Sequence, residues 1–434
     1  MLAGLLVSLV VSVFLCPNAG SLSVARAVAM GTIAMGFGGT MTYGQTLGLT
    51  QNPEVIGNGA ALCWGLIGCA IKGGIWIAFA GAFLGMGLSG VRYRSRDLLF
   101  LMLAALGAYY IGFEVLNQPF NPRRHELPWL YFSSTWELYP NKDPEPRMEY
   151  WGGLLFALAT VLIYAGWHRK DRLALCLGLW GLLGGAIGFP LGQCLQAYHA
   201  WNPEVFQQGI WVNLDPHMNW WNWMETTFGF TMGATLGLGA WIHRARIKPE
   251  DGGEYLPLPV EWILVAAHVS LLVGAEFLPW RKVATLYDLG LILGTLPLMA
   301  VAGGRWWPFL MALPITLIPY SGKTLLELSY EKAEVNPTTG WILYVTIPIF
   351  IATAAAFWFA TRANSKPAAI TFAAPALLLC TWTYFLLNWF YFRFPWPWAE
   401  WSNRTPNGMF FTVCAIGLTV LAIAKWPRKQ TVTL

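Results

Sequence analysis

Apolar segments about as long as a membrane-crossing helix recur along the whole of this chain. An α-helix needs roughly 20 residues to span the hydrocarbon core of a bilayer, and these segments approach that length. With 56% hydrophobic and 11% charged residues, the 434-residue chain has too little polar surface to coat a soluble domain. The predicted fold is an all-α polytopic membrane protein with about 13 transmembrane helices. The segments cover residues 1–15, 27–49, 60–89, 98–116, 150–167, 172–198, 219–242, 259–278, 286–302, 305–321, 340–361, 368–392 and 408–424.

The first segment, 1–15, is short enough to be mistaken for a signal peptide. A signal peptide begins with a positively charged region, whereas no basic residue precedes Arg26. The residue before Cys16 is Leu15 rather than a small residue, which argues against a lipoprotein signal. We therefore expect a retained helix.

Basic residues fall in every second loop, and this alternation predicts an orientation. Cytoplasmic loops of membrane proteins are enriched in Lys and Arg. The opposite loops are richer in Trp, Pro, Asn and acidic residues, and the largest covers residues 117–149. We expect an integral protein of a bacterial inner membrane, with the N-terminus outside and the C-terminus in the cytoplasm. The basic residues are Arg92, Arg94, Arg96, Arg169, Lys170, Arg172, Arg244, Arg246, Lys248, Arg305, Arg362, Lys366, Lys425, Arg428 and Lys429.

A tetrapeptide, Asn-Pro-Glu-Val, occurs twice between the same two landmarks. The copies begin at Asn52 and Asn202. Gly-Gln precedes each copy, at 44–45 and 192–193, and the pattern Gly-Ala-x-Leu-Gly-x-Gly follows each, at 81–87 and 233–239. Such duplication is typical of transporters built from repeated helical units.

The duplication extends over about four helices, because a helix ending near a glutamate follows each copy, with Glu114 in the first and Glu276 in the second. Both copies enter from the cytoplasmic side, so the repeats are predicted to be parallel. The domains are then an N-terminal helix and linker at 1–26, repeat 1 at 27–167, repeat 2 at 168–302 and a possible degenerate third repeat at 303–434.

Gln45 and Gln193 lie at glycine-rich helix ends, where backbone hydrogen bonding is easily interrupted. One hypothesis is that both helices are discontinuous and line a binding site, and Pro190 favours a break in the second copy. The alternative is close helix packing through small residues, with glutamine as an interhelical hydrogen-bond donor.

Lys72 is the most isolated charge in the chain, and the repeat alignment places it one residue from the equivalent of Glu225. Charged groups at such depth usually face a bundle interior or a wet cavity, so we expect Lys72 and Glu225 to converge on one polar cavity. The alternative is that Lys72 reaches the membrane interface along its methylene stem. Glu114 and Glu276 are either rim carboxylates of a pathway or ordinary interfacial residues.

The cysteines give no sign of a metal site or a disulfide framework, since the seven contain no C-x-x-C and no tight Cys/His cluster. Walker loop, dinucleotide fingerprint and nucleophile elbow are also missing from the sequence. No cofactor and no metal are expected. The net charge of +5 belongs to loops that flank helices and does not indicate a nucleic-acid partner.

These features predict a transporter rather than an enzyme, with the lipid bilayer and a small polar solute as partners. Its polar pathway would run between the repeats and be lined by Gln45, Lys72, Glu114, Gln193, Glu225 and Glu276. A second hypothesis is a membrane-embedded enzyme acting on a lipid-linked or glycan substrate at the periplasmic face, with Asp215, His217 or Glu225 as the acid or base. A third is a non-catalytic subunit of a membrane complex, whose partner subunits would complete its charges.

Overall fold

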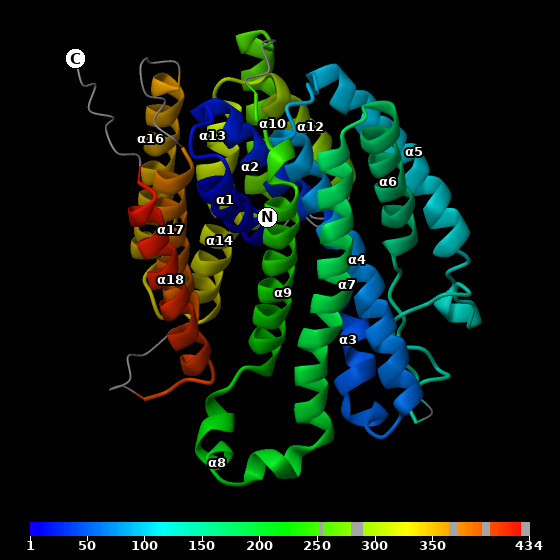
Figure 1. The fold of residues 1–434 in the computed structure, drawn as a ribbon. Coiled ribbons are helices and arrows are strands. Elements are labelled where there is room, and N and C mark those ends of the chain that lie inside the picture. Colours follow the sequence, from blue (N-terminus) through cyan, green and yellow to red (C-terminus); the bar gives the residue numbers. More distant parts are fainter. Residues whose placement is uncertain (140, 251–254, 279–289, 364–371, 393–399, 427–434) are drawn as a thin grey trace, which may run out of the picture.

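The fold is a bundle of helices (Figure 1), seen in a computed structural model that describes residues 1–139, 141–250, 255–278, 290–363, 372–392 and 400–426. Within these residues the secondary structure is helical, apart from one isolated β-bridge between Asn121 and Glu126. The α-helices are α1 (Leu2–Leu15), α2 (Ser21–Gly38), α3 (Gly44–Gln51), α4 (Gly59–Leu88), α5 (Ser95–Leu116), α6 (Trp151–Ile163), α7 (Arg172–Trp201), α8 (Trp211–Leu214), α9 (Trp220–Ile242), α10 (Leu258–Phe277), α12 (Gly290–Gly303), α13 (Trp307–Leu310), α14 (Thr316–Leu325), α15 (Pro337–Gly340), α16 (Ile347–Arg362), α17 (Ala373–Phe392) and α18 (Thr405–Ala424).

Ten helices in the described residues are long and apolar enough to cross a membrane, which makes this an integral membrane protein. The sequence predicted about 13 crossings. Two of the other apolar helices, α1 and α12, are shorter, and α9 is long but less apolar because it carries Glu225 and several threonines. The ten spans are Ser21–Gly38, Gly59–Leu88, Ser95–Leu116, Trp151–His168, Arg172–Trp201, Leu258–Phe277, Trp307–Glu331, Pro337–Arg362, Ala373–Tyr391 and Thr405–Ala424.

Helix α7 lies between α4 and α9 and packs against both through glycines. A Cβ built on Gly185 would lie 1.9 Å from the carbonyl oxygen of Gly73 on α4, and one on Gly192 would lie 2.4 Å from that of Met224 on α9. Glycine at these positions lets the backbones meet, as is common between membrane helices. The glycine-rich stretches of α4 and α7 thus allow close helix packing through small residues.

The two Asn-Pro-Glu-Val copies have the same local structure. Helix α3 ends just before Asn52 and α7 just before Asn202, and a 3-10 turn beginning at the proline follows each, at Pro53–Val55 and Pro203–Gln207. The copies are also neighbours, because the Trp201 indole donates a hydrogen bond to the Thr50 carbonyl at 2.8 Å. Helices α3 and α8, which adjoin the copies in sequence, lie at the lower end of the bundle in Figure 1.

The helix preceding each copy differs, which corrects the prediction that both are discontinuous. In the first copy α2 ends at Gly38 and α3 begins at Gly44, whereas in the second copy α7 is continuous across Pro190. Trp76 explains why the first break needs glycine, since a Cβ on Gly39 would lie 2.6 Å from its ring. Only the first copy therefore interrupts its helix inside the bundle, whereas the second loses the single hydrogen bond that Pro190 cannot donate.

At the opposite end of the bundle, three of the basic loops are joined to one another. Ser89 and Tyr93 donate hydrogen bonds to Asp171 at 2.7 and 2.9 Å, and the Lys248 amide donates to the Leu88 carbonyl at 2.8 Å. Asp171 also caps α7 by accepting from the Ala174 amide at 3.0 Å. Burial raises the pKa of the Asp171 carboxyl, although these hydrogen bonds oppose the rise.

Candidate functional site

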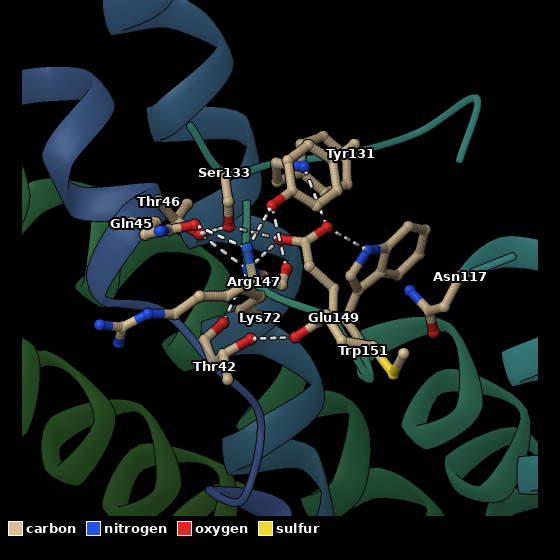
Figure 2. A network of polar contacts seen from close by, with 12 residues as sticks. Thr42, Gln45, Thr46, Lys72, Asn117, Tyr131, Ser133, Arg147, Glu149 and Trp151 are labelled. Carbon is tan, nitrogen blue, oxygen red and sulfur yellow. Dashed lines mark hydrogen bonds and ion pairs between the residues drawn. The ribbon is translucent and has the colours of Figure 1, made fainter. Parts of the chain in front are cut away.

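Lys72 lies inside the bundle, where its ammonium group contacts three oxygen atoms (Figure 2). It donates to the Thr42 carbonyl at 2.7 Å and to the Thr46 hydroxyl at 2.7 Å, and it pairs with Glu149 Oε1 at 2.5 Å. The side chains of Lys72 and Glu149 are each 1% exposed. The ammonium group has three protons and three acceptors, so its hydrogen bonding is complete.

The break between α2 and α3 supplies two of these acceptors. Carbonyl groups inside an α-helix are occupied by amides four residues on, but Thr42 lies between the helices and its carbonyl is available to Lys72. Thr46 follows in the first turn of α3, so its hydroxyl faces the same ammonium group. The glycine-rich break between α2 and α3 thereby binds the ammonium group of Lys72.

Glu149 closes the site from the other side, at the end of the 117–149 loop, which we call the cap segment. Its Oε1 accepts from the Ser133 hydroxyl at 2.8 Å. Its Oε2 accepts from the Phe132 amide at 3.0 Å and from the Trp151 indole at 3.3 Å. A buried carboxylate is stable only when its charge is paired and its oxygens are hydrogen-bonded, and both conditions are met here.

The rest of the cap segment is held by backbone contacts around this pair. Gln45 donates to the Glu145 carbonyl at 2.8 Å and accepts from the Arg147 amide at 3.0 Å. The Thr42 hydroxyl donates to the Met148 carbonyl at 3.0 Å. Gln45, predicted to bind solute, instead binds the chain's own backbone.

Tyr131 ties the two arms of the cap segment together. Its hydroxyl donates to the Arg147 carbonyl at 2.9 Å and accepts from the Arg147 amide at 3.0 Å. Burial raises the pKa of the Tyr131 phenol, and the nearby Glu149 carboxylate adds to the rise, so the proton needed for the first bond is retained. Lys72 and its surroundings therefore fasten the cap segment to α3 and α4.

The alternative in which Lys72 reaches the membrane interface is wrong, because its side chain is enclosed and paired. The expected convergence with Glu225 is not what the structure shows either. The partner of Lys72 is Glu149, whereas the Glu225 carboxylate accepts from Trp221 and Asn222 at 3.1 and 3.4 Å. Glu225 is exposed, and Lys323 and Arg404 are the cations that act on it.

Glu225 and Glu276, both predicted site residues, are influenced by the charge of the same lysine. The positive charge of Lys323 on α14 acts on both carboxylates. Helix α14 packs directly against α10 at this level, since a Cβ on Gly322 would lie 3.0 Å from that of Glu276. We call Glu225, Glu276, Lys323 and Arg404 the mixed-charge cluster.

The remaining two predicted residues lie elsewhere. The buried Gln193 donates to the Thr50 hydroxyl at 2.5 Å, which is the interhelical packing role considered for it. Glu114 is exposed on α5, and no described residue contacts its carboxylate. The six residues thus occupy four places: the Lys72 site with Gln45, the α3 to α7 contact, the mixed-charge cluster and the surface of α5.

Glu149 and Lys323 are the important residues that sequence reasoning missed as site residues. Glu149 stands near Asp143 and Glu145 in a polar loop, and nothing in that run marks it as buried. The one sequence feature that indicates burial of Glu149 is its position directly before the apolar segment at 150–167. Lys323 stands in a run with Glu327, Glu331 and Lys332 whose helical spacing is typical of a solvated helix face, but it lies within the span Trp307–Glu331.

Among the described residues, no group of three or more His, Cys, Asp or Glu side chains could hold a metal ion. Comparison with known protein families, with curated protein sequences and with solved structures finds no match to this chain.

Proposed function

We propose that this protein is an integral membrane transporter of a small polar solute and that the solute binds at the mixed-charge cluster. The observation that carries the proposal is that the positive charge of Lys323 on α14 acts on Glu225 of α9 and on Glu276 of α10, while Gly322, the neighbour of Lys323, packs against Glu276. Ionisable residues inside membrane segments are energetically costly, and they usually mark substrate or ion pathways. The Lys72 site, whose hydrogen bonds are complete, is then an anchor beside the pathway.

The charges of the cluster indicate what kind of solute would fit. Two carboxylates, Glu225 and Glu276, stand with two cations, Lys323 and Arg404. A ligand with an ammonium group and a carboxylate could pair with groups of both signs in this cluster. A dipolar solute such as an amino acid is therefore the first class to test.

Aromatic side chains from α4, α7 and α9 and from the break between α2 and α3 pack on one another and would close the pathway. Phe189 stacks on Phe228 with ring centroids 4.8 Å apart, and Trp76 meets Phe228 edge-on at 5.6 Å. Tyr43 joins this group by contacting Trp76 and Phe189, and the Glu225 carboxylate acts on its hydroxyl. We propose that this aromatic group separates the cluster from the bundle interior.

Labelling of single cysteines tests whether the cluster faces water. In a cysteine-free background, Glu225→Cys and Lys323→Cys should react rapidly with a membrane-impermeant thiol reagent in proteoliposomes. Phe230→Cys is the matched control on α9, since Phe230 is 75% exposed on an apolar surface. Equal, slow labelling at all three positions would show that no aqueous path reaches the cluster and would contradict the proposal.

Uptake measurements test transport itself. Proteoliposomes with the wild-type protein should accumulate radiolabelled amino acids from a mixed pool above the level of empty liposomes, and Glu276→Gln should abolish this uptake. If the cysteines in the cluster label rapidly but no amino acid is taken up, the result would instead favour a non-catalytic subunit of a membrane complex. A partner subunit covering Glu225 and Lys323 would block labelling in native membranes but not after purification.

Two features support the proposed topology of parallel repeats with one basic end. Both Asn-Pro-Glu-Val copies lie at one end of the bundle, whereas three of the basic loops meet at the other. We propose that the basic end is cytoplasmic, as in a bacterial inner membrane, and that the N-terminus is outside.

One observation favours the enzyme hypothesis for the same protein. Asp215 pairs with His199, with His199 Nε2 3.0 Å from Asp215 Oδ1, and the Trp220 indole donates to the same oxygen at 2.7 Å. A carboxylate that orients an imidazole is a common general-base arrangement. His217, predicted as an alternative base, instead meets the ring of Trp401 at 5.5 Å. Hydrolysis of a lipid-linked glycan that is lost in His199→Ala would support this second candidate.

A further inference from the structure

The cap segment encloses a pocket that the transport proposal does not use. It lies between the start of α4 and residues 125–138 and has a volume of about 560 Å³. Small-molecule sites typically measure about 300–1,000 Å³. The pocket is therefore large enough for a ligand of several rings.

Aromatic rings form a large part of the walls of this pocket. Trp64, Trp129, Tyr131 and Trp136 line it, and the His125 imidazole stacks on Trp136 with ring centroids 4.0 Å apart. Trp129 is 92% exposed, and no described residue stacks on it or bonds to it. Its indole faces are free to receive a ligand.

Hydrogen bonds hold the backbone framework of the pocket and the Trp64 ring in place before a ligand arrives. The Trp64 indole donates to the Tyr131 carbonyl at 2.6 Å. Asn121 and Glu126 exchange backbone hydrogen bonds at 2.9 and 3.1 Å, which holds the turn that carries His125. His125 itself has a left-handed backbone with φ of 55°, a conformation that non-glycine residues adopt only when their surroundings enforce it.

The charges around the pocket select against an ionic ligand. Arg123, Arg124, Glu126 and Glu137 are all exposed in or beside it, two of each sign. An anion would need an excess of positive charge, and a quaternary ammonium ion, which aromatic faces alone can attract, gains nothing further from a rim with no net negative charge. The rim therefore fits a neutral ligand with hydrogen-bonding groups.

We infer that this pocket binds a neutral glycan. A pyranose ring presents an apolar face of C–H groups, which pack on the electron-rich face of an indole, and hydroxyl groups around its edge. Trp129 and Trp136 supply the aromatic faces, and Glu137, Thr135 and His125 supply hydrogen-bonding groups. The pocket is independent of the mixed-charge cluster, so glycan binding does not depend on transport.

Isothermal titration calorimetry on the full-length protein tests the inference. The protein is placed in nanodiscs of phosphatidylethanolamine and phosphatidylglycerol, because these lipids have neither sugar nor choline head groups. The probes are maltotriose, cellotriose and the trimer of N-acetylglucosamine, with tetramethylammonium as the cationic comparison. We expect saturable binding of at least one saccharide and none of tetramethylammonium.

Variants then locate the binding. Trp129→Ala and Trp136→Ala should weaken saccharide binding by about tenfold or more, the scale of a lost aromatic anchor. Trp167→Ala should leave it unchanged, since Trp167 is 85% exposed but lies just beyond α6 at its far end from the cap segment. Glu137→Gln keeps a hydrogen-bond acceptor and should have little effect on a neutral sugar. Three outcomes would overturn the inference. Saccharide binding could be equal in Trp129→Ala and Trp167→Ala, tetramethylammonium alone could bind, or no saccharide could bind at all.

Discussion

Lys72 Nζ lies 2.5 Å from Glu149 Oε1, although the two residues are 77 positions apart in the chain. Each side chain is 1% exposed, so the pair lies where neither charge can be satisfied by water. Through the hydrogen bonds of Glu149 to Phe132 and Ser133, the pair connects helix α4 to the cap segment. The folding of the cap segment therefore depends on a charge placed in the middle of a membrane helix.

The close contact of α4 with α7 makes Gly185 intolerant of any side chain. A Cβ there would lie 1.9 Å from the Gly73 carbonyl oxygen, and backbone cannot move aside as a flexible side chain can. We expect Gly185→Ala to cost about 1–3 kcal/mol of unfolding free energy or more, or to prevent folding. The measurement is denaturation in mixed micelles, followed by circular dichroism.

Gly237→Ala is the matched control for that substitution. Gly237 lies in α9 and corresponds to Gly85 in the duplicated glycine pattern, but no heavy atom lies within 4 Å of a Cβ built on it. Alanine there should be neutral or should stabilise the helix by up to about 1 kcal/mol. Equal destabilisation by both substitutions would show that the packing of α4 on α7 is described wrongly.

The proposed orientation predicts that Arg96 and Gln207 face opposite sides of the membrane. Both side chains are exposed, Arg96 beside the basic loops and Gln207 after the second Asn-Pro-Glu-Val copy. In a cysteine-free background, Gln207→Cys should label with an impermeant reagent in intact cells, and Arg96→Cys only after permeabilisation. Labelling of both in intact cells would refute the topology.

Much of the architecture could be predicted from sequence because the signals were local. Apolar length predicted the helices of the bundle, and the isolation of Lys72 in an apolar run predicted that its environment is unusual. The tetrapeptide predicted a shared local structure in both copies. Pro190 was misleading, since a proline removes only one backbone donor and α7 continues through it.

The partners of the charged residues could not be predicted, because they depend on how distant segments pack. Glu149 reaches Lys72 only because the cap segment folds back onto the break between α2 and α3. The charge of Lys323 acts on Glu276 only because α14 packs beside α10. Sequence spacing carries no information about such contacts between segments far apart in the chain.

A double-mutant cycle on Lys72 and Glu149 tests most directly whether their pair anchors the cap segment. Lys72→Met should reduce the unfolding free energy by about 3–5 kcal/mol, because it leaves a buried carboxylate without its cation. Lys72→Arg keeps the charge and should cost less, about 1–3 kcal/mol from its larger volume in a closed site.

The decisive quantity is the coupling between Lys72→Met and Glu149→Gln in the unfolding free energy. The double variant removes both charges, so it should be more stable than the sum of the single losses predicts, by at least about 1 kcal/mol. The exposed pair of Lys142 and Glu54, 2.8 Å apart, is the control and should show no measurable coupling. A coupling of about 1–3 kcal/mol for Lys72 and Glu149 is the result predicted here, and strictly additive losses would contradict the anchoring role of the pair.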